Sequence, residues 1–334
     1  MGILEKNRFI LLYTMTNALG DCLVMGDLMR KIECLLPNVT CVMLHRKNPH
    51  VNLCPADKEA GRFYNVFSLA EVLKCLRRLR SARKQKTVVL GLQMAPGSLQ
   101  GFALYALFKK LGALDYIVDF NLINADIITP PVGKYILELH LNQIRQLFGV
   151  DVPEALFHLE LPFAVGEETG KDLIGIHPWN RRGGKALVWP FEKWAEVLSF
   201  LVERQKPLLV FGNDAQFDAF REYSRTHLPA EIFNKIIFEA SRDVPHLIRQ
   251  IGSCSGIVTV NTVAVHIGHA LNKKMVILNG RSLDFWVPKG ADIYSVYDRQ
   301  AMFLSVGDGK FPDPNFPQVG RIEVADVCKA VLNL

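Results

Sequence analysis

Short apolar runs alternate with helix-patterned segments along the whole chain, and this alternation limits the possible folds more than any other feature. The expected strands are residues 8–15, 40–45, 86–92, 116–120, 173–178, 207–212, 235–241, 256–260 and 275–278. The expected helices between them are residues 19–36, 66–79, 99–111, 135–148, 191–203, 214–224 and 244–251. Strands that alternate with helices of this length need crossover connections, which are right-handed and give mainly parallel sheets. The sequence therefore predicts an α/β fold.

The chain has 334 residues, which is about the length of two domains. A loop-like stretch, "LPFAVGEETGKD" at residues 161–172, separates two alternating blocks. We predict two doubly wound, Rossmann-like domains that face each other across a cleft. The N-terminal domain would span residues 1–160 and the C-terminal domain residues 173–334. The last helix, residues 323–334, could pack on either domain, including back on the N-terminal one.

Composition narrows the class of protein. No window holds 18 consecutive apolar residues, so no transmembrane helix is expected. The first residues, "MGILEKNRFILLYTM", do not have the pattern of a secretory signal. The chain has seven cysteines and no C-x-x-C pair, which favours reduced thiols over a disulfide framework or a zinc site. These features predict a cytoplasmic protein.

A basic run, "KCLRRLRSARKQK" at residues 74–86, has seven cations and no acid. It is interpreted first as a solvated helix face, and second as a surface for anionic lipid or phosphorylated glycan. Nucleic acid is a third option, but no aromatic side chains alternate with the cations to stack on bases.

The junction between a strand and a helix at residues 256–280 is the first candidate site. The apolar strand ends at Asn261 and Thr262, and a helix is expected to follow. Ligands of such sheets bind at the carboxyl ends of strands, where the free N–H groups of a helix start favour an anion. Thr262 and His266 are four residues apart, so they share a helix face, and His266 could donate a hydrogen bond to a diphosphate oxygen. The alternative is a core histidine, which is the preferred interpretation for His269.

A second candidate is the loop in "HPWNRRGGKALVWPFEKW", residues 177–194, where two glycines lie among Arg181, Arg182 and Lys185. Glycines and cations at a strand end suit a phosphate, although no P-loop pattern is present. A solvated basic loop is the alternative. Trp189 and Trp194 are expected to pack in a core.

The third candidate is Asp21, close to the end of the first strand in "YTMTNALGDCLVMGDL". A carboxylate at the mouth of a cleft can act as a general base. The alternative is an acid that only stabilises the first turn of a helix. Asp27 is expected to be a surface charge.

Taken in order, these features resemble the ADP-heptose:lipopolysaccharide heptosyltransferases, glycosyltransferase family nine. The resemblance rests on the glycine–aspartate pair at 20–21, the lysine loop before W-P-x-x-x-W, and "VNTVAVHIGHAL" followed by a strand and "NG". The segments "LLVFGNDAQFDAF" and "MVILNGRSLDFWVPKG" also follow the order of that family. The resemblance covers essentially the whole chain and is firmest from about residue 173 to residue 290.

This resemblance implies a GT-B fold, with an acceptor-binding N-terminal domain and a nucleotide-sugar-binding C-terminal domain. It implies inverting, metal-independent transfer of a sugar, with Asp21 as the catalytic base. Lys185, assisted by Arg182, would bind the diphosphate. Independently of the family, the absence of any D-x-D sequence leaves an acidic metal–diphosphate clamp without obvious ligands.

The nucleotide-sugar motif of the family matches Thr262 and His266. The sequence departs from it at Asn261, where the family usually has aspartate, and at Val263, where it usually has glycine. Asn261 can bond a sugar hydroxyl but has no charge, and Val263 has a β-branched side chain beside the expected diphosphate.

The expected function is transfer of a sugar, heptose from ADP-heptose in the first instance, onto a lipopolysaccharide core or related glycan, without a cofactor. The expected partners are a nucleotide sugar and a glycolipid or glycan acceptor, with no nucleic acid. Peripheral contact with the inner face of the inner membrane is a further option. The alternatives are a non-catalytic sugar-nucleotide-binding protein and a transferase that acts on protein. A sugar-nucleotide epimerase is another option, whereas an oxidoreductase is disfavoured because no G-x-G-x-x-G follows the first strand.

Overall fold

The computed structural model describes most of the chain and divides it into two compact units. The described residues are 8–15, 18–45, 62–92, 102–120, 125–133, 135–163, 172–179, 188–212, 215–279, 286–298 and 319–334. Unit 1 is Met1–Pro162 and unit 2 is Phe163–Leu334. Most of the expected linker lies outside the described residues.

Unit 1 contains a parallel six-stranded sheet with the order β3-β2-β1-β4-β5-β6. Its strands are β1 (Phe9–Met15), β2 (Val39–His45), β3 (Phe63–Asn65), β4 (Val88–Leu92), β5 (Tyr116–Asp119) and β6 (Ile127–Ile128). The central strands are apolar because both faces of the sheet are covered by helices. The order reverses between β1 and β4, and the carboxyl ends of strands at such a switch point are where ligands of this kind of sheet bind.

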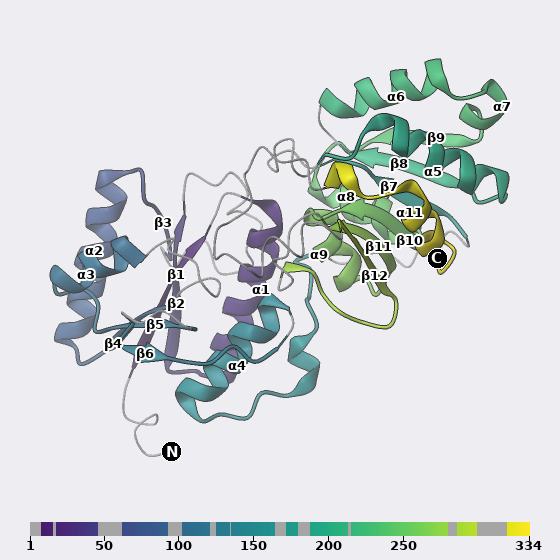
Figure 1. Cartoon of the computed structure of the whole chain (residues 1–334). Helices are drawn as coiled ribbons and strands as arrows, with labels where there is room; N and C mark the ends of the chain where they lie inside the picture. Colours follow the sequence, from purple (N-terminus) through teal and green to yellow (C-terminus); the bar gives the residue numbers. More distant parts are fainter. Residues whose placement is uncertain are drawn as a thin grey trace. The chain divides into compact units, whose positions relative to one another are not determined.

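Helices cover both faces of this sheet. They are α1 (Leu19–Leu35), α2 (Leu69–Lys84), α3 (Phe102–Lys110) and α4 (Ile136–Phe148). Figure 1 shows α2 and α3 side by side on one face and α1 with α4 on the other. The α2–α3 layer packs on alternate residues of the strands, such as Ile10 and Leu12, whereas Tyr13 contacts His140 of α4.

Asp27 is buried, so the expectation that it is a surface charge is wrong. Its carboxylate lies 2.6 Å from the ammonium of Lys31, one turn further along α1, and 2.6 Å from the guanidinium of Arg30. Lys31 is fully buried and also donates to the carbonyl of His158. The pair is buried because α4 and the chain near residue 158 cover this side of α1, and no sequence pattern showed that packing.

Unit 2 repeats the same topology, with the order β12-β11-β10-β7-β8-β9 and parallel pairing throughout. Its strands are β7 (Ile174–His177), β8 (Leu208–Gly212), β9 (Ile236–Ala240), β10 (Gly256–Val260), β11 (Lys274–Asn279) and β12 (Ile293–Tyr297). The switch point lies between β7 and β10, so the junction at Asn261 and Thr262 follows one of the two strands that define it.

The two faces of this sheet carry different helices. Val258, Val260 and Leu278 belong to the core formed with α5 (Phe191–Glu203), α6 (Ala215–His227) and α11 (Val324–Val331). The alternate residues lie towards α9 (Val263–Ala270), where Gly268 packs closely on Ile257 and Met275. The last helix, which the sequence left open between the two domains, therefore packs within unit 2 through Val327 and Val331.

Most of the expected strands and helices are present, and the elements not predicted are short. They are β3, β6, β12, α7 (Ala230–Phe233) and two 3-10 turns, η3 (Glu154–Phe157) and η6 (Val319–Arg321). The remaining helix, α8 (Val244–Ser253), lies where it was expected. Within the part of the chain that the structure describes, no helix has the length and apolar character to span a membrane, and all six cysteines are free thiols.

Candidate active site

The switch point of unit 2 brings His177 and Thr262 together. His177 is the last residue of β7, and its Nδ1 lies 3.4 Å from Oγ1 of Thr262 and 3.5 Å from Oγ1 of Thr259. Thr259 donates its hydroxyl proton to the carbonyl of Val260 at 2.9 Å. Nδ1 of His177 therefore faces two threonine hydroxyls, one of which begins α9.

Thr262 begins α9 as its N-cap. Its backbone is extended, and its Oγ1 accepts from the N–H of Ala264 at 3.2 Å, which confirms the helix start predicted from the sequence. Because Oγ1 already accepts from Ala264 and lies within reach of His177, its own proton can be donated to a ligand oxygen. The first N–H groups of α9 point in the same direction and carry the positive end of the helix dipole.

His266 lies on the inner side of α9, as predicted. Burial, and then the neighbouring His269, lower the pKa of His266 to about 3, so the ring is neutral at physiological pH. The ring meets the edge of Trp286 with the centroids 6.4 Å apart. A neutral imidazole can still donate a hydrogen bond to a diphosphate oxygen, and burial of the ring also agrees with the alternative of a core histidine.

Asn279 was not predicted as a site residue, yet it lies at the same edge of the sheet. It ends β11, the neighbour of β10, and the backbone N–H of Asn261 donates to the carbonyl of Leu278 beside it at 3.3 Å. Asn279 is 1% exposed, and neither polar atom of its carboxamide has a hydrogen-bond partner among the residues that the structure describes. A buried amide without partners costs about 1–3 kcal/mol, so this carboxamide is a candidate contact for a ligand or water. The dipeptide Asn-Gly at a strand end was its only signal in the sequence.

Arg182, Lys185 and the glycines between them lie outside the described residues, but both flanks of their loop are placed. Trp179 packs over Gly212, the last residue of β8. Trp189 donates its indole N–H to the carbonyl of Ile322 at 3.0 Å. Its ring packs edge-to-face on the ring of Trp194, with the ring centroids 4.9 Å apart. The prediction that Trp189 and Trp194 pack in a core is confirmed.

Asp21 lies in the first turn of α1, directly after β1 of the unit 1 switch point. Its side chain is 8% exposed, and it is close enough to Tyr135 to influence the phenol. Burial first, then Asp27, Glu138 and Asp21, raise the pKa of Tyr135. The negative field that Tyr135 experiences therefore comes in part from Asp21. In this first turn of α1, the helix dipole stabilises a negative charge on Asp21.

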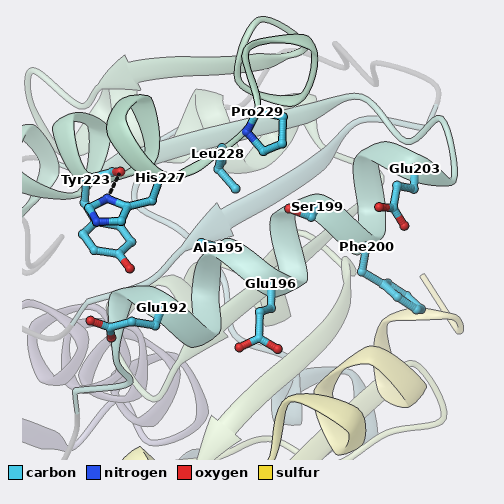
Figure 2. A pocket seen from close by; sticks show the side chains of 10 residues that line it. All are labelled: Glu192, Ala195, Glu196, Ser199, Phe200, Glu203, Tyr223, His227, Leu228 and Pro229. Carbon is cyan, nitrogen blue, oxygen red and sulfur yellow. Dashed lines mark hydrogen bonds between the residues drawn. The ribbon is translucent and has the colours of Figure 1, made fainter.

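An open hollow of about 410 Å³ lies elsewhere in unit 2, between α5 and the end of α6. Figure 2 shows Glu192, Glu196 and Glu203 along α5, and His227 stacked on Tyr223 from α6. The acidic lining does not suit a diphosphate. The hollow lies on α5, which covers the face of the sheet opposite to α9, so it is separate from the switch point.

The buried histidine at the switch point leads to a prediction about pH. Burial lowers the pKa of His177 to about 4, below its unfolded value of 6.5. The unfolded chain therefore binds a proton that the folded chain does not, and stability falls as the pH drops from 6.5 to 4, by on the order of 3 kcal/mol for this group. Urea unfolding at pH 7 and pH 4.5 measures the loss. The loss of stability should be smaller in His177→Asn than in the parent protein. It should equal that of the parent in His227→Asn, because His227 is exposed. Equal losses in the parent and both variants would show that His177 is not the group responsible.

Comparison with known proteins gives one family match, which includes the end of unit 1 and most of unit 2. The family model described as glycosyltransferase family 9 (heptosyltransferase) matches residues 131–296. The E. coli ADP-heptose lipopolysaccharide heptosyltransferase II is 17% identical, with a TM-score of 0.58 over 96% of this chain and 97% of that one. E. coli heptosyltransferase WaaC, solved with ADP, is 13% identical, with a TM-score of 0.60 over 97% of this chain and 100% of that one.

A further structure of the same fold is the iron-containing dodecameric glycosyltransferase TibC from enterotoxigenic E. coli. It is 14% identical, with a TM-score of 0.55 over 98% of this chain and 78% of that one. No curated protein sequence matches the chain. At these identities the structures establish the fold, and the predicted α/β architecture of two doubly wound units of GT-B type is confirmed.

Proposed function

Because the chain carries a glycosyltransferase family 9 domain and is a heptosyltransferase-like glycosyltransferase, we propose that it transfers heptose from ADP-heptose to a lipopolysaccharide core or a related glycan. The donor is suggested by similar structures described with ADP or as ADP-heptose enzymes. In this proposal the protein acts in the cytoplasm and the acceptor is a glycolipid. The protein would therefore bind its acceptor at the inner face of the inner membrane. The observation that carries the proposal is the position of Thr262, the N-cap of α9 at the switch point of unit 2.

The donor would bind to unit 2. The diphosphate would accept hydrogen bonds from the first N–H groups of α9 and from the hydroxyl of Thr262. Lys185 and Arg182 would neutralise its charge as it leaves. Asn261 would bond a hydroxyl of the sugar and neutral His266 would donate to the same donor, whereas Val263 would restrict how closely the diphosphate approaches the helix start.

The acceptor would bind to unit 1, where Asp21 would take the proton of the attacking hydroxyl. That oxygen forms a bond to the anomeric carbon on the face opposite to the diphosphate, and the bond from this carbon to the diphosphate oxygen breaks. The configuration at the carbon is therefore inverted. Positive charge develops on the sugar ring during the step, as in glycoside hydrolysis. An ionised carboxylate at the helix start suits this role.

We propose that no metal ion assists this step and that no cofactor is needed. The support is the sequence, which has no D-x-D to hold a metal–diphosphate complex, and the cations Arg182 and Lys185, which can take the place of a metal. Sugar transfer should then be unaffected by EDTA. Iron is the metal to test, because one similar structure is described as iron-containing. A loss of turnover with EDTA that added iron restores would contradict this part of the proposal.

A non-catalytic sugar-nucleotide-binding protein is the second candidate. Asn261 and Val263 favour it, because each departs from the residue usual in the family at the donor site. Consumption of ADP-heptose in the presence of an acceptor separates the two: an enzyme releases ADP, whereas a binding protein retains affinity without turnover. A transferase that acts on protein would release ADP only with a protein acceptor.

Replacement of Thr262 tests the site itself. Thr262→Val removes the hydroxyl and the cap, so we expect ADP to bind at least tenfold more weakly and the free energy of unfolding to fall by about 1 kcal/mol. Thr226→Val is the matched control, because Thr226 is exposed and its hydroxyl donates to the carbonyl of Glu222 within α6. Isothermal titration calorimetry with ADP measures the affinities. Equal affinity in both variants would contradict the assignment of the diphosphate to this helix start.

A further inference from the structure

Positive charge is concentrated in one segment of unit 1. Residues 72–114 contain nine lysines and arginines and no acid, whereas the whole chain has a net charge of only +6. The rest of the chain is therefore net acidic, by three charges. The segment includes β4, α3 and all of α2 except its first turn, which holds one acid, Glu71. The two helices lie side by side on one face of the sheet (Figure 1).

The two faces of α2 differ in chemistry. Cys75, Leu76 and Leu79 are buried against the sheet. The outward face carries the cations Arg77 and Lys84, which are exposed. This face is amphipathic along its length, because apolar side chains replace the cations near the helix start.

The start of α2 exposes large apolar side chains to solvent. Phe67 is 72% exposed, Leu69 74% and Leu73 42%. The single acid of this turn, Glu71, is occupied in accepting the backbone N–H of Asn65. Exposed apolar groups that lie together on a monomer mark an interaction site more often than they are accidental.

α3 extends this surface. Arg80 donates to the carbonyl of Leu111 through two nitrogens, at 2.8 and 2.6 Å, and Arg83 forms an ion pair with Asp115 at 2.6 Å. These contacts hold the carboxyl end of α2 against the end of α3. The outward side of α3 then adds an exposed leucine, Leu107, and an exposed cation, Lys110.

We propose that the outer face of α2 and α3 binds a bilayer surface rich in anionic phospholipid. The exposed side chains of Phe67, Leu69 and Leu73 would enter the boundary between headgroups and acyl chains, and Arg77, Lys84 and Lys110 would contact lipid phosphates. Charge complementarity selects an anionic surface, because residues 72–114 have nine cations and no acid. The three exposed apolar side chains at one end of the face select a bilayer over a soluble anion. The inference identifies the surface for the membrane contact in the proposed function and does not depend on the nucleotide site.

Vesicle sedimentation tests the proposal with the full-length protein. Vesicles of phosphatidylcholine alone are compared with vesicles that contain phosphatidylglycerol, at low and high salt. One variant combines Leu69→Ser with Leu73→Ser, and a second combines Arg77→Gln, Lys84→Gln and Lys110→Gln. The control combines Leu332→Ser with Lys329→Gln, an exposed leucine and an exposed lysine at the end of α11 in unit 2.

We expect the protein to bind the anionic vesicles and to be released by salt. Each cation removed should lower the partition coefficient about fivefold. The leucine variant should bind at least tenfold more weakly, and the control should bind as the parent protein does. ADP binding and thermal melting show that each variant is folded, so vesicle binding can fail while the donor site is intact. Equal binding to neutral and anionic vesicles, or by all proteins, would overturn the proposal, as would displacement from the vesicles by a single-stranded oligonucleotide.

Discussion

Replacement of Asp21 by asparagine is expected to lower the rate of sugar transfer by about three orders of magnitude, with little change in affinity for the donor. The carboxylate would take the proton of the acceptor hydroxyl, and loss of a positioned general base typically costs ~10²–10⁴ in rate. Asparagine keeps the size and a hydrogen-bonding oxygen but cannot accept the proton. The measurement is ADP release under saturating ADP-heptose, alongside the affinity for ADP.

The control for this variant is another acid in a first helical turn. Asp218→Asn changes an exposed residue at the start of α6, where the only expected effect is a small loss of helix stabilisation. It should retain the parent rate. If Asp21→Asn retains full turnover, Asp21 is an acid that stabilises α1 and the base is another group. If Asp21→Asn loses both turnover and ADP binding, the substitution has disturbed the fold or the donor site, and the role of general base is not supported.

The ion pair inside α1 should give the largest effect on stability. Among the residues that the structure describes, Lys31→Met leaves the buried Asp27 carboxylate with the half-exposed Arg30 as its one remaining counter-ion. Breaking a buried pair in this way typically costs ~3–5 kcal/mol, because the remaining charge has no water around it. We expect the midpoint of urea unfolding to fall accordingly, and the double variant Lys31→Met/Asp27→Leu to recover part of the loss.

Lys109→Met is the matched comparison. Lys109 also forms an ion pair, with Asp126, but both side chains reach solvent. Pairs of this kind contribute about 0–1 kcal/mol. Similar losses in Lys31→Met and Lys109→Met would show that burial of the Asp27 pair does not control stability.

The alternation of strands and helices was enough to predict the architecture, because a buried parallel strand is a continuous apolar run that stands out from an amphipathic helix. The missing strands are instructive. β3 and β6 have three and two residues and lie at the two edges of the unit 1 sheet. Strands this short have too few residues to show a period and are defined by pairing, not by composition. β12 has five residues and lies at an edge of the unit 2 sheet, and Val296 is its one buried residue, so it is not a continuous apolar run.

The candidate site was predictable only where the signal is local. Thr262 as a helix start follows from a strand that stops at a polar pair, and His266 follows from helical spacing. His177 and Asn279 belong to the same place only because β7, β10 and β11 are neighbours, and strand order is not readable from one sequence. Asp27 was misjudged for the same reason, since its burial depends on a helix more than a hundred residues away along the chain.

The central claim is that the helix start at Thr262 holds the diphosphate of an adenine nucleotide sugar. Calorimetric titration of ADP, UDP and GDP, with and without EDTA, tests it most directly when the parent protein is compared with Lys185→Ala. The account predicts that ADP binds more tightly than the other two, that EDTA has no effect, and that the variant binds at least tenfold more weakly. If none of the three nucleotides binds, then Asn261 and Val263 do not support a donor site, and the account is wrong.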